Sequence, residues 1–358
     1  MALRSELLTP TPRALGSIVL EIQAVNCWLS CQHCYAGNFS VTKKQMSLED
    51  VFSCISFFKE ISKEPLTVYL YKDLLDYGEK FSFIEELSRL GLKGAIELLP
   101  THGWARGDGS KETAYRLAHS GVKKVWLTLH GNQNEHDYFV RRPGAYQRIF
   151  DFAQSAINTG VGVSWNLMLR KSNQLSLKSL LSNDDVLSLS QELYVSVPGG
   201  LGNGRSIIHD IPEIETVRQF QNLGIMTSTD IFSEAEWEFR IKSLNRLSTK
   251  CAMEPYAEIR IMPDLSIMLH DFPHDRVIGN ISTDTPKTIL ERIYSANSFV
   301  GQLNRREPTQ ELLDLCEEQS KGGKDAYCIY GVVSRWIDRR TFHECCLEAN
   351  PIPVLEKT

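Results

Sequence analysis

The sequence predicts an α/β fold, a partial (βα)6 barrel of the TIM type followed by a small α+β extension. The first observation is an alternation of short apolar runs with longer amphipathic segments from residue 17 onwards, the pattern of βα units and of a parallel sheet. The second is a group of three cysteines directly after the first apolar run, residues 18–22. Because ligands of such barrels bind at the C-terminal ends of the strands, the cysteines lie where this fold would place its site.

The predicted elements follow the apolar pattern. Helices are expected at residues 51–61, 81–90 and 146–158, with Ser47 and Asp50 as a capping box before the first and Gly160 after the last. The third and fourth expected strands end in Thr101-His102-Gly103 and His130-Gly131. The expected strands are residues 18–22, 66–70, 95–99, 124–129, 161–168 and 193–197.

Composition excludes several classes of partner. The 358 residues allow a barrel with an appendage, and 42% hydrophobic and 23% charged residues are typical of a globular chain. A formal net charge of −5 gives no field that would attract nucleic acid or an anionic membrane. No apolar run is long enough to span a bilayer, and residues 1–16 lack the apolar core of a secretion signal. We therefore expect a cytoplasmic protein with neither nucleic acid nor a membrane as partner.

The cysteines are the strongest chemical signal. Nine cysteines, an odd number, favour metal ligation over disulfides in a cytoplasmic chain. Cys27, Cys31 and Cys34 have the spacing C-x3-C-x2-C, and three thiolates from one short loop suit an iron–sulfur cluster with one iron left open. An open coordination position distinguishes a catalytic metal site from a closed structural one. The alternatives are buried free thiols or a zinc site, for which His33 inside the loop is poorly placed as a fourth ligand.

This loop, placed after a first strand and followed by Tyr35, resembles the signature loop of the radical S-adenosylmethionine (radical SAM) superfamily. The resemblance implies a 4Fe–4S cluster on the three cysteines whose open iron binds the amino and carboxylate groups of SAM. An electron from a reductant such as flavodoxin or ferredoxin would then cleave SAM to methionine and a 5′-deoxyadenosyl radical that abstracts hydrogen from a substrate. The resemblance also implies that His33 packs against the adenine of SAM and that Tyr35 lies beside the cofactor.

Further residues for SAM are implied by the same resemblance. The segment from Val125 to Tyr146 resembles the fourth strand and following loop of the superfamily branch with SPASM or twitch extensions. Thr128, with Arg141 or Arg142, would hold the carboxylate and ribose of SAM, since an arginine fork suits a carboxylate. A strand threonine and surface arginines are the structural alternative. Contacts with ribose and adenine are implied at later strand ends, by Asn166, Val197 and Gly199.

The segment after the second strand departs from the family pattern. The family has Gly-Gly-Glu-Pro here, which receives the amino group of SAM, whereas this chain reads Tyr71-Lys72-Asp73-Leu74. Asp73 falls where the glutamate would be and is expected to replace part of its contact. The glycines are absent, so the backbone is not expected to approach SAM in the usual way.

The C-terminal part resembles a SPASM or twitch domain with an altered ligand pattern. Leu265 stands where its hairpin has glycine, and His270 stands where its second cysteine would be. One hypothesis is a single auxiliary iron–sulfur cluster, because imidazole can replace a thiolate ligand. The other is a packed lid whose cysteines are buried apolar residues. The candidate ligands are Cys251, His270, Cys316, Cys328, Cys345 and Cys346.

These resemblances predict a radical SAM enzyme that acts on a ribosomally made peptide or another specialised metabolite by crosslinking, epimerisation or oxidation. A dehydrogenase of sugars or aminocyclitols is the alternative within the superfamily, and a non-catalytic cluster-binding relative is the alternative outside catalysis. No residue is assigned to catalysis beyond cofactor binding. The expected parts are a lead-in (1–16), the partial barrel core (17–205), a helical connection (206–250) and the SPASM/twitch-like domain (251–358).

Overall fold

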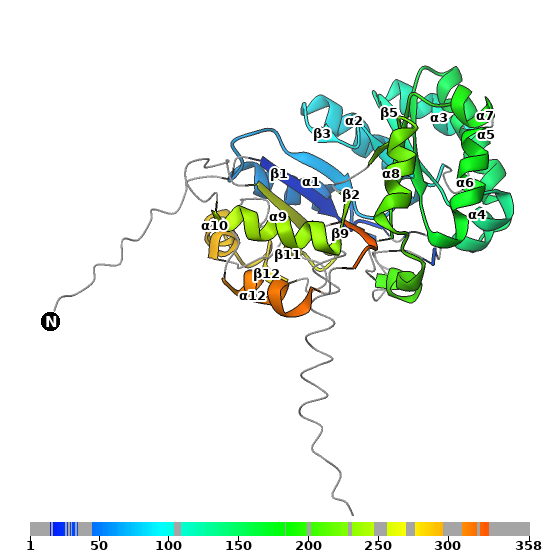
Figure 1. The fold of residues 1–358 in the computed structure, drawn as a ribbon. Helices are drawn as coiled ribbons and strands as arrows, with labels where there is room; N and C mark the ends of the chain where they lie inside the picture. The colour runs from blue at the N-terminus through cyan, green and yellow to red at the C-terminus, as the bar shows by residue number, and fades with distance from the viewer. Residues whose placement is uncertain are drawn as a thin grey trace, which may run out of the picture.

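The computed structural model of the chain contains two larger sheets and one pair of strands (Figure 1). It describes residues 15, 17–25, 27, 29, 31–32, 34, 45–103, 109–182, 184–198, 202–227, 231–246, 256–269, 276–295, 310–320 and 323–328.

The first sheet combines the start of the barrel with strands from the C-terminal part. Its order is β12-β11-β10-β1-β2-β3, and its strands are β1 (Ser17–Ile22), β2 (Thr67–Leu70), β3 (Lys93–Gly94), β10 (Tyr256–Ile261), β11 (Ser266–Leu269) and β12 (Arg276–Asn280). Strand β1 pairs in parallel with both β2 and β10, whereas β11 runs antiparallel to both of its neighbours, β10 and β12. The C-terminal strands therefore extend the barrel sheet at β1.

The second sheet is parallel and follows the order of the sequence. Its strands are β4 (Leu99–Thr101), β5 (Lys124–Leu129), β6 (Gly162–Met168), β7 (Glu192–Ser196) and β8 (Met226–Thr227). The separate pair consists of β9 (Ile231–Ser233) and β13 (Ala326–Cys328), which run antiparallel. Five of the predicted strands correspond to β1, β2, β5, β6 and β7.

The predicted third strand is wrong. Residues 95–98 form a turn between β3 and β4, because the amides of Glu97 and Leu98 both donate to the carbonyl of Gly94, at 2.9 and 3.0 Å. Ala95 and Ile96 are buried in this turn, which explains why their apolar run looked like a strand. At this turn the chain passes from the first sheet to the second.

Helices lie between the strands, and the three predicted ones correspond to α1, α2 and α5. Ser47 is the N-cap of α1, since its Oγ accepts a hydrogen bond from the amide of Asp50 at 3.1 Å. No helix in the described part of the chain is long and apolar enough to cross a membrane. The α-helices are α1 (Leu48–Lys59), α2 (Lys80–Arg89), α3 (Ser110–His119), α4 (Gln133–Val140), α5 (Ala145–Asn158), α6 (Gln174–Leu181), α7 (Asp184–Ser188), α8 (Ile214–Asn222), α9 (Glu234–Arg246), α10 (Pro286–Ser295) and α12 (Gln310–Gln319), and the 3-10 helices are η1 (Leu74–Asp76), η2 (Lys171–Asn173) and η3 (Gly202–Asp210).

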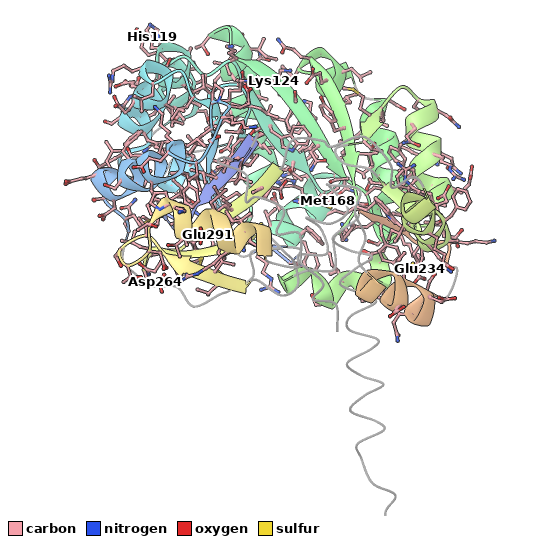
Figure 2. The ribbon with its side chains drawn as sticks, turned by 90° about the vertical axis from the view of Figure 1, so that its left-hand side faces the viewer. His119, Lys124, Met168, Glu234, Asp264 and Glu291 are labelled. Atoms are coloured by element: carbon pink, nitrogen blue, oxygen red, sulfur yellow. The ribbon has the colours of Figure 1, made fainter. Side chains whose placement is uncertain are left out.

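One hydrophobic core joins the barrel strands to the C-terminal elements. Leu20 of β1, Trp165 of β6, Ile259 of β10 and Ile289 of α10 are fully buried members of the same cluster. Figures 1 and 2 both show α10 beside the first sheet. In Figure 2, Met168 marks the C-terminal end of β6, the end at which the cysteine loop after β1 is also expected.

Gly91, which precedes β3, and Gly94, its last residue, provide a test of the fold. Gly91 and Gly94 both have positive φ, of 63° and 101°, but a Cβ on Gly94 would lie 2.7 Å from the backbone nitrogen of Val68, whereas a Cβ on Gly91 would meet nothing within 4 Å. We expect Gly91→Ala to lower the free energy of unfolding by about 1 kcal/mol through backbone strain alone. Gly94→Ala should lower the free energy of unfolding by at least about 2 kcal/mol more than Gly91→Ala does, because the backbone of β2 at Val68 must move. Urea unfolding of both variants measures the difference, and equal losses would contradict the packing described.

Candidate active site

The three predicted cluster ligands share one cavity. Cys27, Cys31 and Cys34 are half-buried and line a cavity of about 210 Å³. The opposite wall consists of residues at the ends of β2, β4 and β5 and on α4 and α5. Polar members of that wall are Lys72, Asp73, Thr101, His102, Thr128, His130 and His136, and apolar members are Pro100, Trp126, Val140, Ala145 and Ile149; Leu29, from the cysteine loop itself, also lines the cavity.

The cysteine loop is fixed at both of its sides. Where it leaves β1, the amide of Gln23 donates to the carbonyl of Ile261 in β10 at 2.8 Å. Further along, the amide of Gln32 donates to the carbonyl of Phe139 at 3.0 Å, and its side-chain Nε2 donates to the carbonyl of Tyr138 at 3.2 Å. The loop is thereby attached to the C-terminal end of α4, a contact that no local sequence signal indicates.

The thiols of Cys27 and Cys31 do not ionise readily on their own. Burial raises the pKa of Cys27 to about 11 and that of Cys31 to about 12, and the neighbouring Cys34 adds to the rise at Cys31. Metal ligands must be deprotonated, so cluster binding has to supply the free energy of ionisation. Three reduced thiols on one cavity are the donor set that a 4Fe–4S cluster requires, and we conclude that these residues fit the cluster.

Asp73 joins the ends of β2 and β4. Its buried carboxylate accepts hydrogen bonds from the amide of Leu75 at 2.9 Å, the hydroxyl of Thr101 at 3.0 Å and the amide of His102 at 2.6 Å. The bond from Leu75 also caps η1. Asp73 lines the cavity as the resemblance implies, and its oxygens already have protein donors. Its expected contact with the amino group of SAM stays a prediction.

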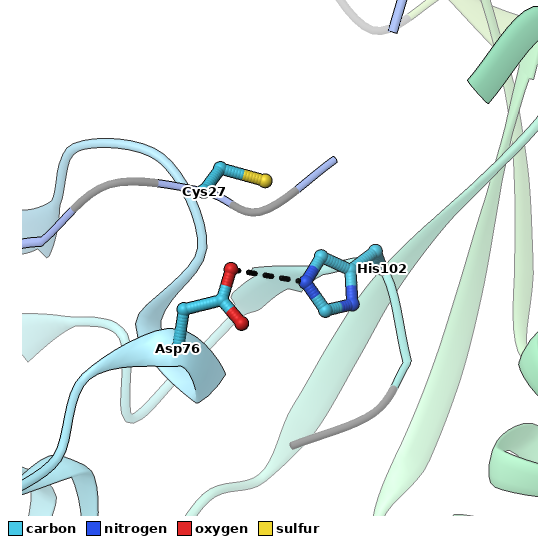
Figure 3. Close-up of side chains that lie close together, drawn as sticks. All are labelled: Cys27, Asp76 and His102. Carbon is cyan, nitrogen blue, oxygen red and sulfur yellow. Dashed lines mark hydrogen bonds and ion pairs between the residues drawn. The ribbon is translucent and has the colours of Figure 1, made fainter. Parts of the chain in front are cut away.

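His102 connects Asp73 with the first cysteine. Its Nε2 lies 3.2 Å from Oδ2 of Asp73 and 3.3 Å from Oδ2 of Asp76. Burial lowers the pKa of His102, but the two carboxylates and Cys27 outweigh burial and raise it to about 10. The sulfur of Cys27, a carboxylate oxygen of Asp76 and a ring nitrogen of His102 lie within 4.8 Å of one another (Figure 3).

This group of three bears on the zinc alternative. Thiolate, imidazole and carboxylate are all ligands that zinc takes, so Cys27, Asp76 and His102 are a possible mononuclear site that uses only one of the loop cysteines. The sequence pattern suggested only His33 for such a role, and it did not indicate Asp76 or His102. A signal was present, because Thr101-His102-Gly103 ends a predicted strand at the side where barrel ligands bind.

Of the residues implied for the carboxylate and ribose of SAM, Thr128 lines the cavity. The amide of Asn166 on the paired position of β6 lies 3.4 Å from the Thr128 hydroxyl. Arg141 follows the last residue of α4 with a φ of 56°, and its charge offsets a small part of the rise that burial causes in the pKa of the Cys31 thiol. The amide of Arg142 donates to the carbonyl of Asp137 at 2.8 Å, so its backbone belongs to the end of α4.

The remaining implied SAM contacts are placed only in part. Val197 follows β7 and is buried. His33, Tyr35 and Gly199 lie outside the described residues. The roles of all these residues toward SAM stay predictions.

The predicted ligands of an auxiliary cluster are mostly outside the described residues, namely Cys251, His270, Cys345 and Cys346. Cys328 belongs to β13, and its side chain is also outside the description. Cys316 lies on α12 and is fully buried, and burial, with the nearby carboxylate of Glu238, raises the pKa of its thiol to about 12. Both hypotheses for the C-terminal cysteines therefore stay open.

Lys72 adopts a backbone conformation that favours glycine. Its φ is 83°, and it occupies the position of the second glycine in the family's Gly-Gly-Glu-Pro. The left-handed backbone expected of a glycine is thus present here although the glycine is not. Its partly exposed side chain lines the cavity next to Asp73.

His136, like His130, is a buried histidine of the cavity wall. Burial lowers its pKa to about 4, although the nearby Asp137 acts in the opposite direction. Its ring lies 5.4 Å from that of His130 and 6.0 Å from that of Tyr146, measured between centroids. His136 is therefore neutral at pH 7 and forms part of an aromatic wall.

Known proteins support the fold. No protein-family model matches the sequence, and no curated protein matches it. The structure resembles SuiB from Streptococcus suis bound to the precursor peptide SuiA, with a TM-score of 0.60 and 13% identity over 87% of this chain and 75% of SuiB. For SuiB bound to S-adenosylmethionine the TM-score is 0.58 and the identity 13%, over 80% of this chain and 68% of SuiB. For the protein anSMEcpe with bound AdoMet the TM-score is 0.53 and the identity 15%, over 94% of this chain and 99% of anSMEcpe. The predicted fold class, a partial barrel with a C-terminal extension, is confirmed.

The backbone at Lys72 gives the first prediction for the site. Because the left-handed conformation costs an L-residue about 1–2 kcal/mol and glycine almost nothing, Lys72→Gly should be about 1 kcal/mol more stable to unfolding than Lys72→Ala. In ordinary backbone the order of the two variants would be reversed. Urea unfolding of this pair measures the difference, and an alanine variant as stable as the glycine variant would refute the assigned backbone.

The buried His136 predicts a pH dependence of stability. Its pKa of about 4 lies below the ordinary value of 6.5, so the unfolded chain binds the proton first as the pH falls. The stability that neutral His136 contributes is complete above pH 6.5 and declines by about 2 kcal/mol by pH 5. Between pH 7.5 and pH 5, the free energy of unfolding of His136→Gln should therefore fall by about 2 kcal/mol less than that of the wild type. Identical pH slopes for the two proteins would show that His136 is not kept neutral.

Proposed function

We propose that this protein is a radical SAM enzyme in which Cys27, Cys31 and Cys34 hold a 4Fe–4S cluster. The observation that carries the proposal is the common cavity of these thiols at the C-terminal strand ends of a partial barrel. The motif alone would fit other metal sites. Its position in a fold shared with proteins solved with S-adenosylmethionine bound supports SAM as the second cofactor.

The side chains around the cavity have separate tasks in this proposal. A bound cluster would supply the electron that cleaves SAM to methionine and a 5′-deoxyadenosyl radical. Arg141, close to Cys31, would bind the carboxylate of SAM, and Thr128 with Asn166 would bind its ribose hydroxyls. Leu29, Trp126, Val140 and Ile149 form an apolar wall that would keep water from a reactive intermediate.

A peptide is the substrate class that the comparisons favour. SuiB was solved with the precursor peptide SuiA, and anSMEcpe with the Kp18Cys peptide. We infer that this chain also modifies a peptide, by a crosslink, an epimerisation or an oxidation, and that flavodoxin or ferredoxin reduces it. Turnover of an aminocyclitol, without binding of any peptide, would instead support the sugar branch of the superfamily.

The cysteines provide the test of this function. In anaerobically reconstituted protein, we expect iron and sulfide to fall by about four per chain in each of the variants Cys27→Ala, Cys31→Ala and Cys34→Ala. Formation of 5′-deoxyadenosine from SAM and dithionite should fall by more than about 100-fold, because the open iron is lost with the cluster. Cys54→Ala is the matched control, since Cys54 is a buried residue of α1 that does not line the cavity.

Each outcome has a distinct meaning. Four irons with nucleoside formation in the wild type, both lost in the three variants and kept in the control, support the proposal. About eight irons falling to about four would add an auxiliary cluster at the C-terminal cysteines. Zinc in place of iron, with no nucleoside formed, would refute the proposal and favour the site of Cys27, Asp76 and His102.

A further inference from the structure

Two aromatic side chains meet on one face of the second sheet. Along β5, partly exposed and buried residues alternate, so Trp126 points away from the face on which Val125 and Leu127 are fully buried. Tyr194 of β7 lies on the same face as Trp126, because it pairs through β6 with Thr128, two residues further along β5. The ring centroids of Trp126 and Tyr194 are 4.6 Å apart and their planes are inclined by 33°. The two rings are therefore stacked with an offset or tilt, an arrangement that aromatic pairs favour.

The strand between the two rings makes their contact possible. Strand β6 separates β5 from β7, and its residue Ser164 pairs with Trp126 on one side and with Glu192 on the other. The side chain of Ser164 is small and fully buried. A serine here leaves room for the rings of Trp126 and Tyr194 to approach each other across β6.

A polar group fixes the ring of Tyr194. Its hydroxyl donates to Oε2 of Glu192 at 3.2 Å, and the same oxygen accepts from Nζ of Lys124 at 2.7 Å and from the hydroxyl of Ser164 at 2.9 Å. Tyr194 is thus held at its hydroxyl by these contacts and on its ring by Trp126. We call the stacked pair of Trp126 and Tyr194 the aromatic platform. Its geometry is set by the protein alone, as a binding surface of defined shape requires.

Trp126 brings the aromatic platform to the cavity. It is partly exposed and lines the cavity that the three cysteines share. A strand rises about 3.3 Å per residue, so Trp126 lies about 7 Å deeper in the barrel than Thr128. Figure 2 marks the two ends of this sheet by Lys124, where β5 begins, and Met168, where β6 ends. A ligand group that reaches Trp126 therefore lies below the layer of strand ends to which the ribose of SAM is assigned.

We propose that the aromatic platform binds an aromatic side chain of the substrate, which stacks on Trp126. The proposal rests on the proposed function and names a feature of its peptide substrate. Stacked rings attract each other beyond the effect of the apolar area they bury. An indole face also attracts cations. However, Asp73 is the one carboxylate among the described residues that line the cavity, its oxygens already accept protein donors, and Lys72 beside it adds positive charge. An uncharged flat ring is therefore the group that fits.

The experiment compares two probes of nearly equal shape. N-acetyl-phenylalaninamide carries an aromatic ring, and N-acetyl-cyclohexylalaninamide carries the saturated ring, which has similar apolar area and no π system. The affinity of the reconstituted protein for each probe is measured by ligand-observed nuclear magnetic resonance with saturating SAM, so that the site of adenine is occupied. Because adenine is also a flat ring, the affinity for SAM is measured separately by equilibrium dialysis.

Three variants give the expected results. In Trp126→Leu, the affinity for the aromatic probe should fall about 2- to 12-fold more than that for the saturated probe. Trp126→Phe keeps a smaller ring, so it should still prefer the aromatic probe but bind it more weakly than the wild type does. Tyr115→Leu is the matched control, because Tyr115 is an exposed residue of α3 that does not line the cavity. The control should leave both affinities unchanged.

The outcomes separate this inference from the proposed function. A wild-type protein that binds no iron and forms no 5′-deoxyadenosine refutes the proposed function, and the inference with it. When cluster and nucleoside are present, equal affinities of the wild type for the two probes, or equal losses of both in Trp126→Leu, overturn the inference alone. A Trp126→Leu protein that loses affinity for SAM and keeps it for the aromatic probe also overturns the inference, since the ring bound at Trp126 is then adenine. If Trp126→Leu does not fold, Trp126→Phe decides, and an unchanged affinity for the aromatic probe overturns the inference.

Discussion

The buried carboxylate of Asp73 is the contact on which the geometry of the cavity depends. Strands β3 and β4 belong to different sheets, so no ladder of backbone hydrogen bonds connects them. Asp73 spans this junction, because it follows β2 in the first sheet and accepts hydrogen bonds from Thr101 and His102 at the end of β4 in the second. Without it, these donors would be left buried and unpaired, at a cost of about 1–3 kcal/mol each. The same residue thus holds the sheets together and determines where the His102 ring lies.

The electrostatics of the cavity favour the metal-bound state of the loop. Burial alone keeps the thiols of Cys27 and Cys31 protonated. Each has a cationic neighbour, His102 beside Cys27 and Arg141 beside Cys31, that works against this effect. These neighbours do not cancel the burial, so positive charge from a bound group is required for full ionisation. The thiols of Cys27 and Cys31 are therefore expected to stay protonated until a positively charged group binds, and to release their protons when it does.

Local signals in the sequence were sufficient for much of the fold. Ser47 caps α1 as predicted, and five strands lie where their apolar runs indicated. The predicted third strand was wrong because the backbone forms a turn after Gly94 within a buried apolar run. A buried turn and a buried strand give the same apolar pattern in the sequence. The pairing of β10 with β1 brings residues 256–261 beside 17–22, and no local pattern encodes such a contact.

The same distinction holds at the site. The spacing of Cys27, Cys31 and Cys34 was readable because all three ligands come from one loop. The contact between Asp73 and His102 was not, because it depends on how the turn after β3 returns the chain to the second sheet. Thr128 and Asn166 became neighbours only through the register of β5 and β6. Sequence spacing therefore located the metal ligands, and tertiary structure was needed to identify the groups around them.

Two substitutions that looked like lost function have a different structural meaning. Lys72 and Leu265 both stand where the family pattern has glycine, and both have positive φ, of 83° and 65°. A left-handed residue other than glycine persists only where the surrounding structure determines the backbone. Two contacts fix the backbone at Leu265. Its amide donates to the carbonyl of Met262 at 2.8 Å, and its side chain packs against the hydrophobic core. The backbone at both positions is therefore left-handed without a glycine. The absence of glycine from the sequence at these two positions is thus no evidence that the backbone there has a different shape from that of a glycine.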